Sequence, residues 1–280
     1  MASYSFLTVF RFVKLSAVCS LGILIIFLSV TSKAQSSYLG FDRNDYPGDE
    51  NLPILRRTFS YAGYWLNNPP GAKSNSWAGK RNALEAAGFG FLVLFNGRLY
   101  KELKHNAAAT GGADGRAAAR TAMREGFPSR SIIFLDIEEG GRMLPEQKAY
   151  IYEWVDAVSA AGFGAGVYCS GIPAKEGKSS IVTAEDIREN AQRRDISFWV
   201  TNDACPPSPG CAVSPSAPSQ SGVAFADVWQ FAQSPRRKDF ATQCRNYSSD
   251  GNCYPPGVDP ASHLHLDVNT ATSADPSHGR

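Results

Sequence analysis

Eight short apolar runs, separated by helix-like segments or loops, constrain the fold of this chain more than any other feature. The runs lie at 38–42, 58–66, 89–95, 131–138, 163–169, 196–202, 225–231 and 263–269. Periodic apolar and Ala positions predict helices at 76–88, 112–126, 145–162 and 183–194. Strands that alternate with helices in this way predict a parallel sheet.

The number of runs and the length of the chain together favour a closed sheet. Eight strands in about 245 residues suit a (β/α)8 TIM-type barrel, an α/β fold in a single domain. An open doubly wound sheet would carry a Gly-rich phosphate loop after its first strand, and GFDRND at 40–45 is no such loop. The last crossovers are rich in Cys and Pro, so we expect them to be partly irregular.

The first 34 residues have the pattern of a secretory signal peptide. Arg11 and Lys14 precede an apolar stretch at 15–30, and Ser32-Lys33-Ala34 supplies small residues for cleavage before Gln35. We therefore expect a signal at 1–34, a barrel domain at 35–280 and a secreted or periplasmic protein. The alternative is an uncleaved membrane anchor, which would be the only contact with a membrane.

Cysteine usage and charge agree with an exported protein. Cys205 and Cys211 flank one short loop segment, and Cys244 and Cys253 flank another, so an oxidising compartment would let each pair close locally. Cross-pairing between the segments is the alternative, while no histidine follows at zinc-finger spacing, and we expect no metal or other cofactor. The formal net charge of +2, without a long basic tract, does not indicate a nucleic-acid partner.

Carboxylates lie at or near the ends of three of the apolar runs. Side chains on a strand alternate between its faces, so Asp136 and Glu138 share one face of the run at 131–138. Asp42 ends the first run and Asp267 lies in the last, and the first and last strands of a closed barrel are neighbours. Four acids would then meet at the carboxyl-terminal mouth of the barrel, where such folds carry their chemistry. The alternative for Asp42 and Asp267 is an ordinary capping role at a strand end.

The ordered series GFD, FLDIEE, GVYCSG, FWVTN, VWQF and LDVN resembles the family 25 glycoside hydrolases, the muramidases of bacteria and phages. The segments FSYAGYWLNNPP and GADGRAAARTAMREGFP are more closely similar to the glycoside-hydrolase-like domain of unknown function 1906. The resemblance implies that Glu138 is the general acid, Asp136 its partner, and Asp42 and Asp267 the flanking carboxylates.

The same resemblance implies that aromatic and amide side chains line a sugar-binding groove. These are Tyr168, Trp199, Trp229 and Gln230, and further candidates are Tyr64 or Trp65 and Asn96. Adjacent Tyr64 and Trp65 cannot both face inward, and core packing is the alternative for the tryptophans.

These features predict a secreted hydrolase of a β-linked N-acetylated carbohydrate polymer such as peptidoglycan, acting through carboxylate acid/base catalysis. The alternatives are a catalytically inactive glycan-binding or cell-envelope protein on the same barrel, and a structural cell-surface protein. The chain departs from the muramidase pattern where the second run leads into LNNPP and the third into NGR, which leaves the glycan open.

Overall fold

The computed structural model describes Met1, residues 37–240 and residues 244–280. The predicted signal peptide therefore lies almost entirely outside the described residues. Gln35–Arg280 forms one compact unit. None of the helices in the described parts of the chain has the length and apolar character needed to span a membrane.

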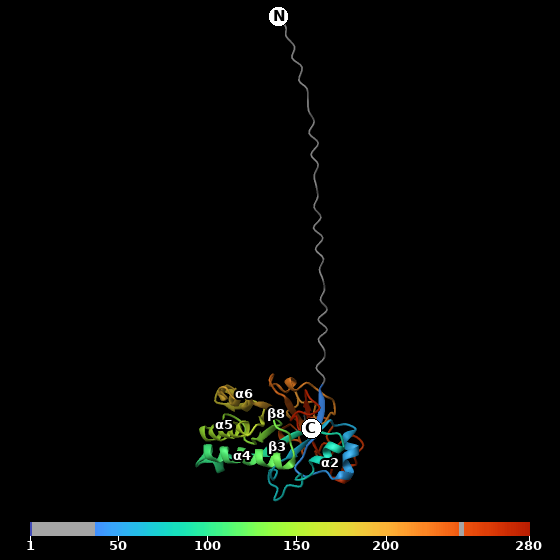
Figure 1. Cartoon of the computed structure of the whole chain (residues 1–280). Helices are drawn as coiled ribbons and strands as arrows, with labels where there is room; N and C mark the ends of the chain where they lie inside the picture. The colour runs from blue at the N-terminus through green and yellow to red at the C-terminus, as the bar shows by residue number, and fades with distance from the viewer. Residues whose placement is uncertain (2–36, 241–243) are drawn as a thin grey trace. The chain divides into compact units, whose positions relative to one another are not determined.

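Eight strands of this unit close into a barrel, which confirms the predicted α/β barrel (Figure 1). Around the barrel the order is β1-β10-β9-β8-β5-β4-β3-β2. The strands are β1 (Tyr38–Asp42), β2 (Tyr61–Trp65), β3 (Gly90–Asn96), β4 (Ile132–Asp136), β5 (Gly164–Ser170), β8 (Ser197–Thr201), β9 (Val228–Ala232) and β10 (Asp267–Ala271). A separate hairpin, β6 (Ala174–Glu176) and β7 (Ser179–Ile181), was not predicted from the sequence.

The last strand differs from the predicted one in both position and direction. The sequence predicts a parallel strand at 263–269, whereas β10 begins at Asp267 and pairs antiparallel with both β1 and β9. The described residues between β9 and β10 contain short 3-10 helices but no α-helix that would carry the chain back to the base of the barrel. The chain therefore enters β10 from the mouth, and Asp267 lies at the mouth because the strand starts there.

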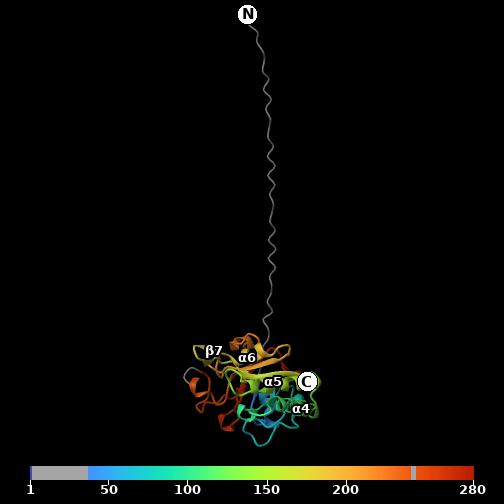
Figure 2. The same ribbon diagram turned by 90° about the vertical axis from the view of Figure 1, so that its left-hand side faces the viewer.

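Helices cover the outside of the barrel. They are α1 (Leu52–Arg56), α2 (Arg81–Ala86), α3 (Tyr100–Leu103), α4 (Ala107–Glu125), α5 (Pro145–Ala160) and α6 (Thr183–Asn190). Three of the predicted helices correspond closely to α4, α5 and α6, while the one predicted at 76–88 forms only the short α2. Figure 2 shows α4, α5 and α6 side by side over one flank of the barrel.

Glycines let α4 and α5 pack closely. A Cβ atom at Gly111 or Gly115 would collide with the backbone carbonyl groups of Tyr150 or Trp154 on α5. Glycine in a helix costs about 0.5 to 1 kcal/mol relative to alanine, so close packing against α5 accounts for its use here. The two helices thereby form one closely packed layer on this flank.

The end of the barrel opposite the mouth is closed by the carboxyl-terminal segment. The backbone N–H of Phe91 donates to Asp275 Oδ1 at 2.8 Å, and that of Val93 donates to Ser277 Oγ at 2.8 Å. Ile132 N–H donates to the backbone carbonyl of Ser277, also at 2.8 Å. Above this segment the interior is filled by aromatic rings such as Phe134 and Trp199, whose centroids lie 6.2 Å apart. The mouth is consequently the open end of the barrel.

Candidate active site

The structure brings the four predicted acids to one rim. Asp42 ends β1, Asp136 ends β4, Glu138 follows two residues later, and Asp267 opens β10 as the register partner of Asp42. All four line a cavity of about 190 Å³ in the barrel mouth, called the acid cavity here. A Cβ atom at Gly63 on β2 would lie 2.6 Å from the Cβ atom of Asp42, so glycine leaves the space that this carboxylate occupies.

Asp136 is the acid whose surroundings least favour ionisation. Its side chain is 3% exposed, and neither carboxyl oxygen accepts a hydrogen bond from the described residues. Burial, followed by the nearby charges of Glu138 and Asp42, raises the pKa of Asp136 well above its usual value. Burial without a donor thus favours the protonated form of Asp136.

Glu138 lies closer to solvent than Asp136. The residue is exposed, and it lines both the acid cavity and a larger cavity beside it. Desolvation raises the pKa of Glu138, while the neighbouring Asp136 lowers it. The two carboxyls therefore influence each other's titration, and Glu138 is the one accessible from the groove.

Asp42 is buried and Asp267 is half-buried, and both lie among amide groups. Asn269 Nδ2 donates to Asp42 Oδ1 at 2.6 Å, and Gln230 Nε2 donates to the two oxygens of Asp42 at 3.0 and 3.3 Å. Burial raises the pKa of Asp42 to about 6 despite these donors. Asp267 accepts the backbone N–H of Ser234 at 2.6 Å, and burial followed by the charge of Asp42 raises its pKa well above the usual value.

Polar aromatic side chains complete the wall of the acid cavity. Tyr168 Oη donates to Gln230 Oε1 at 2.7 Å, and Trp199 Nε1 donates to Asn269 Oδ1 at 2.9 Å. The rings of Tyr168 and Trp199 lie 4.4 Å apart, tilted by 57°. Trp65 of β2 lines the same cavity. The predicted residues Tyr168, Trp199 and Gln230 therefore lie together beside the acids.

Two predicted groove residues lie elsewhere. Trp229 directly precedes the inward-facing Gln230, so it points to the outer face of β9, where its Nε1 donates to the Asn202 carbonyl at 3.0 Å. Tyr64 likewise faces outward from β2, and its hydroxyl donates to Glu125 Oε2 at 2.6 Å. The prediction that these two side chains line the groove is wrong, because strand alternation turns each of them into the packing layer outside the barrel.

Asn96 lies in the larger cavity, which has a volume of about 510 Å³ and is called the loop cavity here. Its Nδ2 donates to the Asn68 carbonyl at 2.9 Å, and its backbone N–H donates to Asn67 Oδ1 at 2.7 Å. The loop cavity and the acid cavity share Pro70, Asp136 and Glu138. On the other side, the acid cavity shares Asn44 and Asp267 with a third cavity of about 190 Å³. The three cavities form one groove across the mouth.

Sequence reasoning did not assign roles to Asn269 and Gln233. Asn269 follows Asp267 by two residues and so shares its face, a spacing that could have identified it in the same way as Asp136 and Glu138. Gln233 Nε2 donates to Gln230 Oε1 at 3.2 Å from beyond the end of β9, where no periodic pattern marks it. Loop residues of this kind become visible only in three dimensions.

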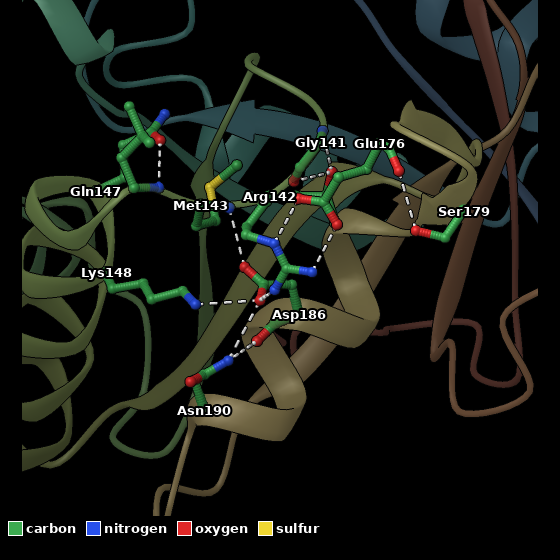
Figure 3. A network of polar contacts seen from close by, with 11 residues as sticks. Gly141, Arg142, Met143, Gln147, Lys148, Glu176, Ser179, Asp186 and Asn190 are labelled. Carbon is green, nitrogen blue, oxygen red and sulfur yellow. Dashed lines mark hydrogen bonds and ion pairs between the residues drawn. The ribbon is translucent and has the colours of Figure 1, made fainter.

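A polar network fixes the loop that carries Glu138. Figure 3 shows Asp186 of α6 accepting bonds from Lys148 Nζ at 3.1 Å and from the backbone N–H of Met143 at 2.9 Å. Arg142 also contacts Asp186 and forms a bidentate pair with Glu176 of β6 at 2.6 and 2.7 Å. These bonds anchor the segment just after the Asp136–Glu138 pair on two neighbouring elements.

Glu139 anchors the same loop from its other side. Its Oε2 accepts the backbone N–H of Tyr100, the first residue of α3, at 2.7 Å, and Gln147 Nε2 at 2.8 Å. Glu139 therefore caps α3, and it does not line the acid cavity.

The disulfide pairing differs from the predicted local closure. The bonds join Cys205 to Cys244 and Cys211 to Cys253, across 39 and 42 residues of chain. Each bond links the loop after β8 to the loop between β9 and β10, because these loops pack on one another above the barrel.

Cys169 is buried and unpaired, and burial raises the pKa of its thiol. Within the described residues, no group of three or more His, Cys, Asp or Glu side chains is arranged to hold a metal ion.

Comparison with known proteins agrees with this architecture. The model of the family described as Rv2525c-like, glycoside hydrolase-like domain matches residues 58–208, a range that includes Asp136 and Glu138 but neither Asp42 nor Asp267. The match confirms the resemblance that the sequence motifs indicate. No curated protein matches the chain by sequence.

Solved structures share the fold at low sequence identity. An uncharacterized protein of B. stearothermophilus is 19% identical over 84% of this chain and 95% of its own, with a TM-score of 0.53. The Tat-secreted protein Rv2525c of Mycobacterium tuberculosis is 15% identical over 88% of this chain and 98% of its own, with a TM-score of 0.50. At these identities, the likeness shows the fold alone.

Proposed function

Because the chain belongs to the Rv2525c-like, glycoside hydrolase-like domain family, we propose that it is an exported glycoside hydrolase. Its proposed substrate is a β-linked N-acetylated glycan such as peptidoglycan. The observation that carries this proposal is the pairing of a buried, donor-free Asp136 with a solvent-accessible Glu138 in an extended groove. Glycosidic bond cleavage requires a carboxyl group that can supply a proton to the leaving oxygen, and a pair in which burial raises the pKa can hold that proton near neutral pH.

In the proposed reaction, Glu138 acts as the general acid. The one proton held by the Asp136–Glu138 pair passes through Glu138 to the glycosidic oxygen as the bond to the anomeric carbon breaks. Both carboxyls are then ionised until the attacking water returns a proton to Glu138. The positive charge that develops on the sugar is stabilised by the nearest carboxylate. Either a carboxylate or the substrate's own acetamido group attacks the anomeric carbon, and water then completes hydrolysis.

The side chains around the acids suit a sugar. Trp65 and Tyr168 line the acid cavity, where the small exposed part of each ring would contact the C–H bonds of a pyranose ring, and Gln230 and Gln233 offer amide groups to its hydroxyls. Asn67, Asn68 and Asn96 provide further amide and carbonyl groups along the loop cavity. This mixture of aromatic and amide groups supports a carbohydrate ligand over an apolar one.

Export is part of the same proposal. Two disulfide bonds between distant loops require an oxidising compartment, which agrees with a cleavable signal at 1–34. An uncleaved signal would instead hold the barrel at a membrane surface. The polymer proposed as substrate lies outside the cytoplasmic membrane in either case.

The test is release of reducing ends from purified peptidoglycan and from chitin by the oxidised domain. Glu138→Gln keeps the size of the side chain but removes the acid, so turnover should fall by about 100-fold or more. The matched control is Glu153→Gln on α5, where the glutamate is exposed and outside all groove cavities. Wild-type protein that binds these glycans but releases no reducing ends would contradict the proposal and favour a glycan-binding protein.

A further inference from the structure

The third cavity of the groove is lined by an arginine side chain that has no role in the proposed reaction. This cavity, the Arg43 pocket, is lined by Arg43, Asn44, Asp45, Ser234, His265 and Asp267. It adjoins the acid cavity through Asn44 and Asp267. A substituent on a sugar bound beside the acids therefore has direct access to it.

Arg43 has no ionic partner within the described part of the protein. Its side chain is half-buried, and its guanidinium group forms neither a salt bridge nor a hydrogen bond with another described residue. The other arginine in the groove differs, because Arg98 forms a bidentate pair with Asp114 at 2.8 and 3.1 Å. A half-buried guanidinium without a salt bridge is free to form charge-assisted hydrogen bonds with an anionic ligand.

The charges of Asp45 and Asp267 act on Arg43, but neither acid forms a salt bridge with it. Asp45 lines the same pocket but forms no salt bridge with the guanidinium. Asp267 is half-buried, and its two oxygens accept the backbone N–H of Ser234 and Gln230 Nε2 at 2.6 and 3.3 Å. Because these donors occupy the carboxyl group of Asp267, the guanidinium of Arg43 is left available to a ligand.

His265 supplies a second unused polar atom. Its Nδ1 is buried and has no hydrogen-bond partner among the described residues. Burial and the charge of Arg43 lower the pKa of His265, so the ring is neutral at neutral pH. The hydrogen bond of 3.1 Å from Trp65 Nε1 to the Arg43 carbonyl fixes this pocket against the wall of the acid cavity.

We propose that the Arg43 pocket binds a carboxylate substituent of the glycan in the groove. A planar guanidinium matches the two oxygens of a carboxylate, and the small volume of about 190 Å³ suits one such group. The inference rests on the proposed function, and it narrows the substrate class to amino-sugar polymers that carry carboxylates. The carboxylate can belong to a lactyl ether, as in peptidoglycan, or to a uronic acid.

Calorimetric binding in the Glu138→Gln background tests this without requiring turnover. The probes are soluble, peptide-free peptidoglycan strands, the same strands with their lactyl carboxylates reduced to alcohols, hyaluronan oligosaccharides and neutral chitin oligosaccharides. We expect the reduced strands to bind about tenfold more weakly than the carboxylated strands, the usual scale for loss of one charge-assisted contact. Comparison of peptidoglycan strands with hyaluronan distinguishes the lactyl from the uronic source.

Arg43→Gln should abolish the preference for carboxylated strands, and Arg43→Lys should retain part of it. The matched control is Arg57→Gln, since Arg57 is exposed and outside the groove. Equal affinity of the wild-type pocket for carboxylated and reduced strands would overturn the inference and leave the proposed hydrolase intact. Selective binding of carboxylated strands without hydrolysis by the protein with Glu138 intact would support the inference while contradicting the proposed function.

Discussion

The carboxyl group of Asp42 is buried at the end of β1, and its hydrogen bonds from Asn269 and Gln230 only partly compensate for the loss of water. Its pKa is about 6 in the folded protein, against about 4 in an unfolded chain. A raised pKa in the folded state means that this group favours folding fully below about pH 4, and that the contribution is lost as pH rises to about 6.

Asp42→Asn should therefore gain stability relative to wild type as pH rises. We expect the difference in unfolding free energy to shift by about 2 to 3 kcal/mol in favour of the variant between about pH 3.5 and pH 7. Guanidinium unfolding with intact disulfides measures it, with Asp239→Asn at an exposed site as control. A difference that stays constant, or that moves against the variant at high pH, would show that burial does not raise this pKa.

Asp136 and Glu138 share their titration, so the pH profile of hydrolysis should report the pair. The rate should fall at high pH as the pair loses its proton, because the proton donor is then absent. Asp136→Asn removes the carboxyl with the strongly raised pKa. The basic limb should move to lower pH, and the maximum rate should fall.

Turnover of wild type and Asp136→Asn, measured side by side across pH, checks this expectation. A basic limb that stays in place or moves to higher pH would mean that Glu138 titrates independently of Asp136. The inward placement of the two residues would then not amount to a functional pair.

The loops above the mouth are held by disulfides rather than by helices. Cross-links over 39 and 42 residues remove much conformational freedom from the unfolded chain, in theory about 4 kcal/mol each. Replacing Cys211 and Cys253 together by Ser should lower the unfolding free energy by about 2 to 4 kcal/mol. Cys169→Ala, which removes a thiol without breaking a cross-link, is the control.

Peptide mapping without reduction checks the connectivity directly. It should yield the pairs Cys205 with Cys244 and Cys211 with Cys253. Peptides linking Cys205 to Cys211 would restore the local pairing that the sequence suggests and would contradict the packing of these two loops.

The alternation of side chains along a strand predicts from sequence which site residues share a face. It places Asp136 and Glu138 on one face and separates Tyr64 from Trp65 without a structure. The same rule separates Trp229 from Gln230, but it does not say which of them faces inward until the strand is positioned in the barrel. The direction of β10 was not predictable, since an Asp beside an apolar segment looks the same at either end of a strand.

The disulfide pairing could not be predicted from the sequence, because it also depends on how distant segments pack. Each loop segment between Cys205 and Cys211 or between Cys244 and Cys253 is short enough to close on itself. What decides the pairing is the packing of two loops that lie far apart in the chain, and no local pattern encodes it. Asp267 nevertheless lies at the mouth beside Asp42, but for a different reason from the predicted one: β10 is antiparallel and begins there, whereas the sequence predicted the end of a parallel strand.

The whole barrel is closed at its base and open at its mouth, and the groove crosses the open end. The carboxyl-terminal segment closes one end, while the disulfide-linked loops and the anchored loop after β4 shape the other. The acids lie at the centre of the groove, with the loop cavity on one side and the Arg43 pocket on the other. This arrangement is suited to a chain of sugars that crosses the mouth.

The most direct test of the central claim is mass spectrometry of the fragments released from purified peptidoglycan in water enriched in oxygen-18. Hydrolysis adds one water oxygen at each cleaved bond, so every new reducing end should carry one heavy oxygen, and Glu138→Gln should release fewer fragments by about 100-fold or more. Absence of released fragments, or fragments whose new ends carry no label, would contradict the assignment of this barrel as a glycoside hydrolase.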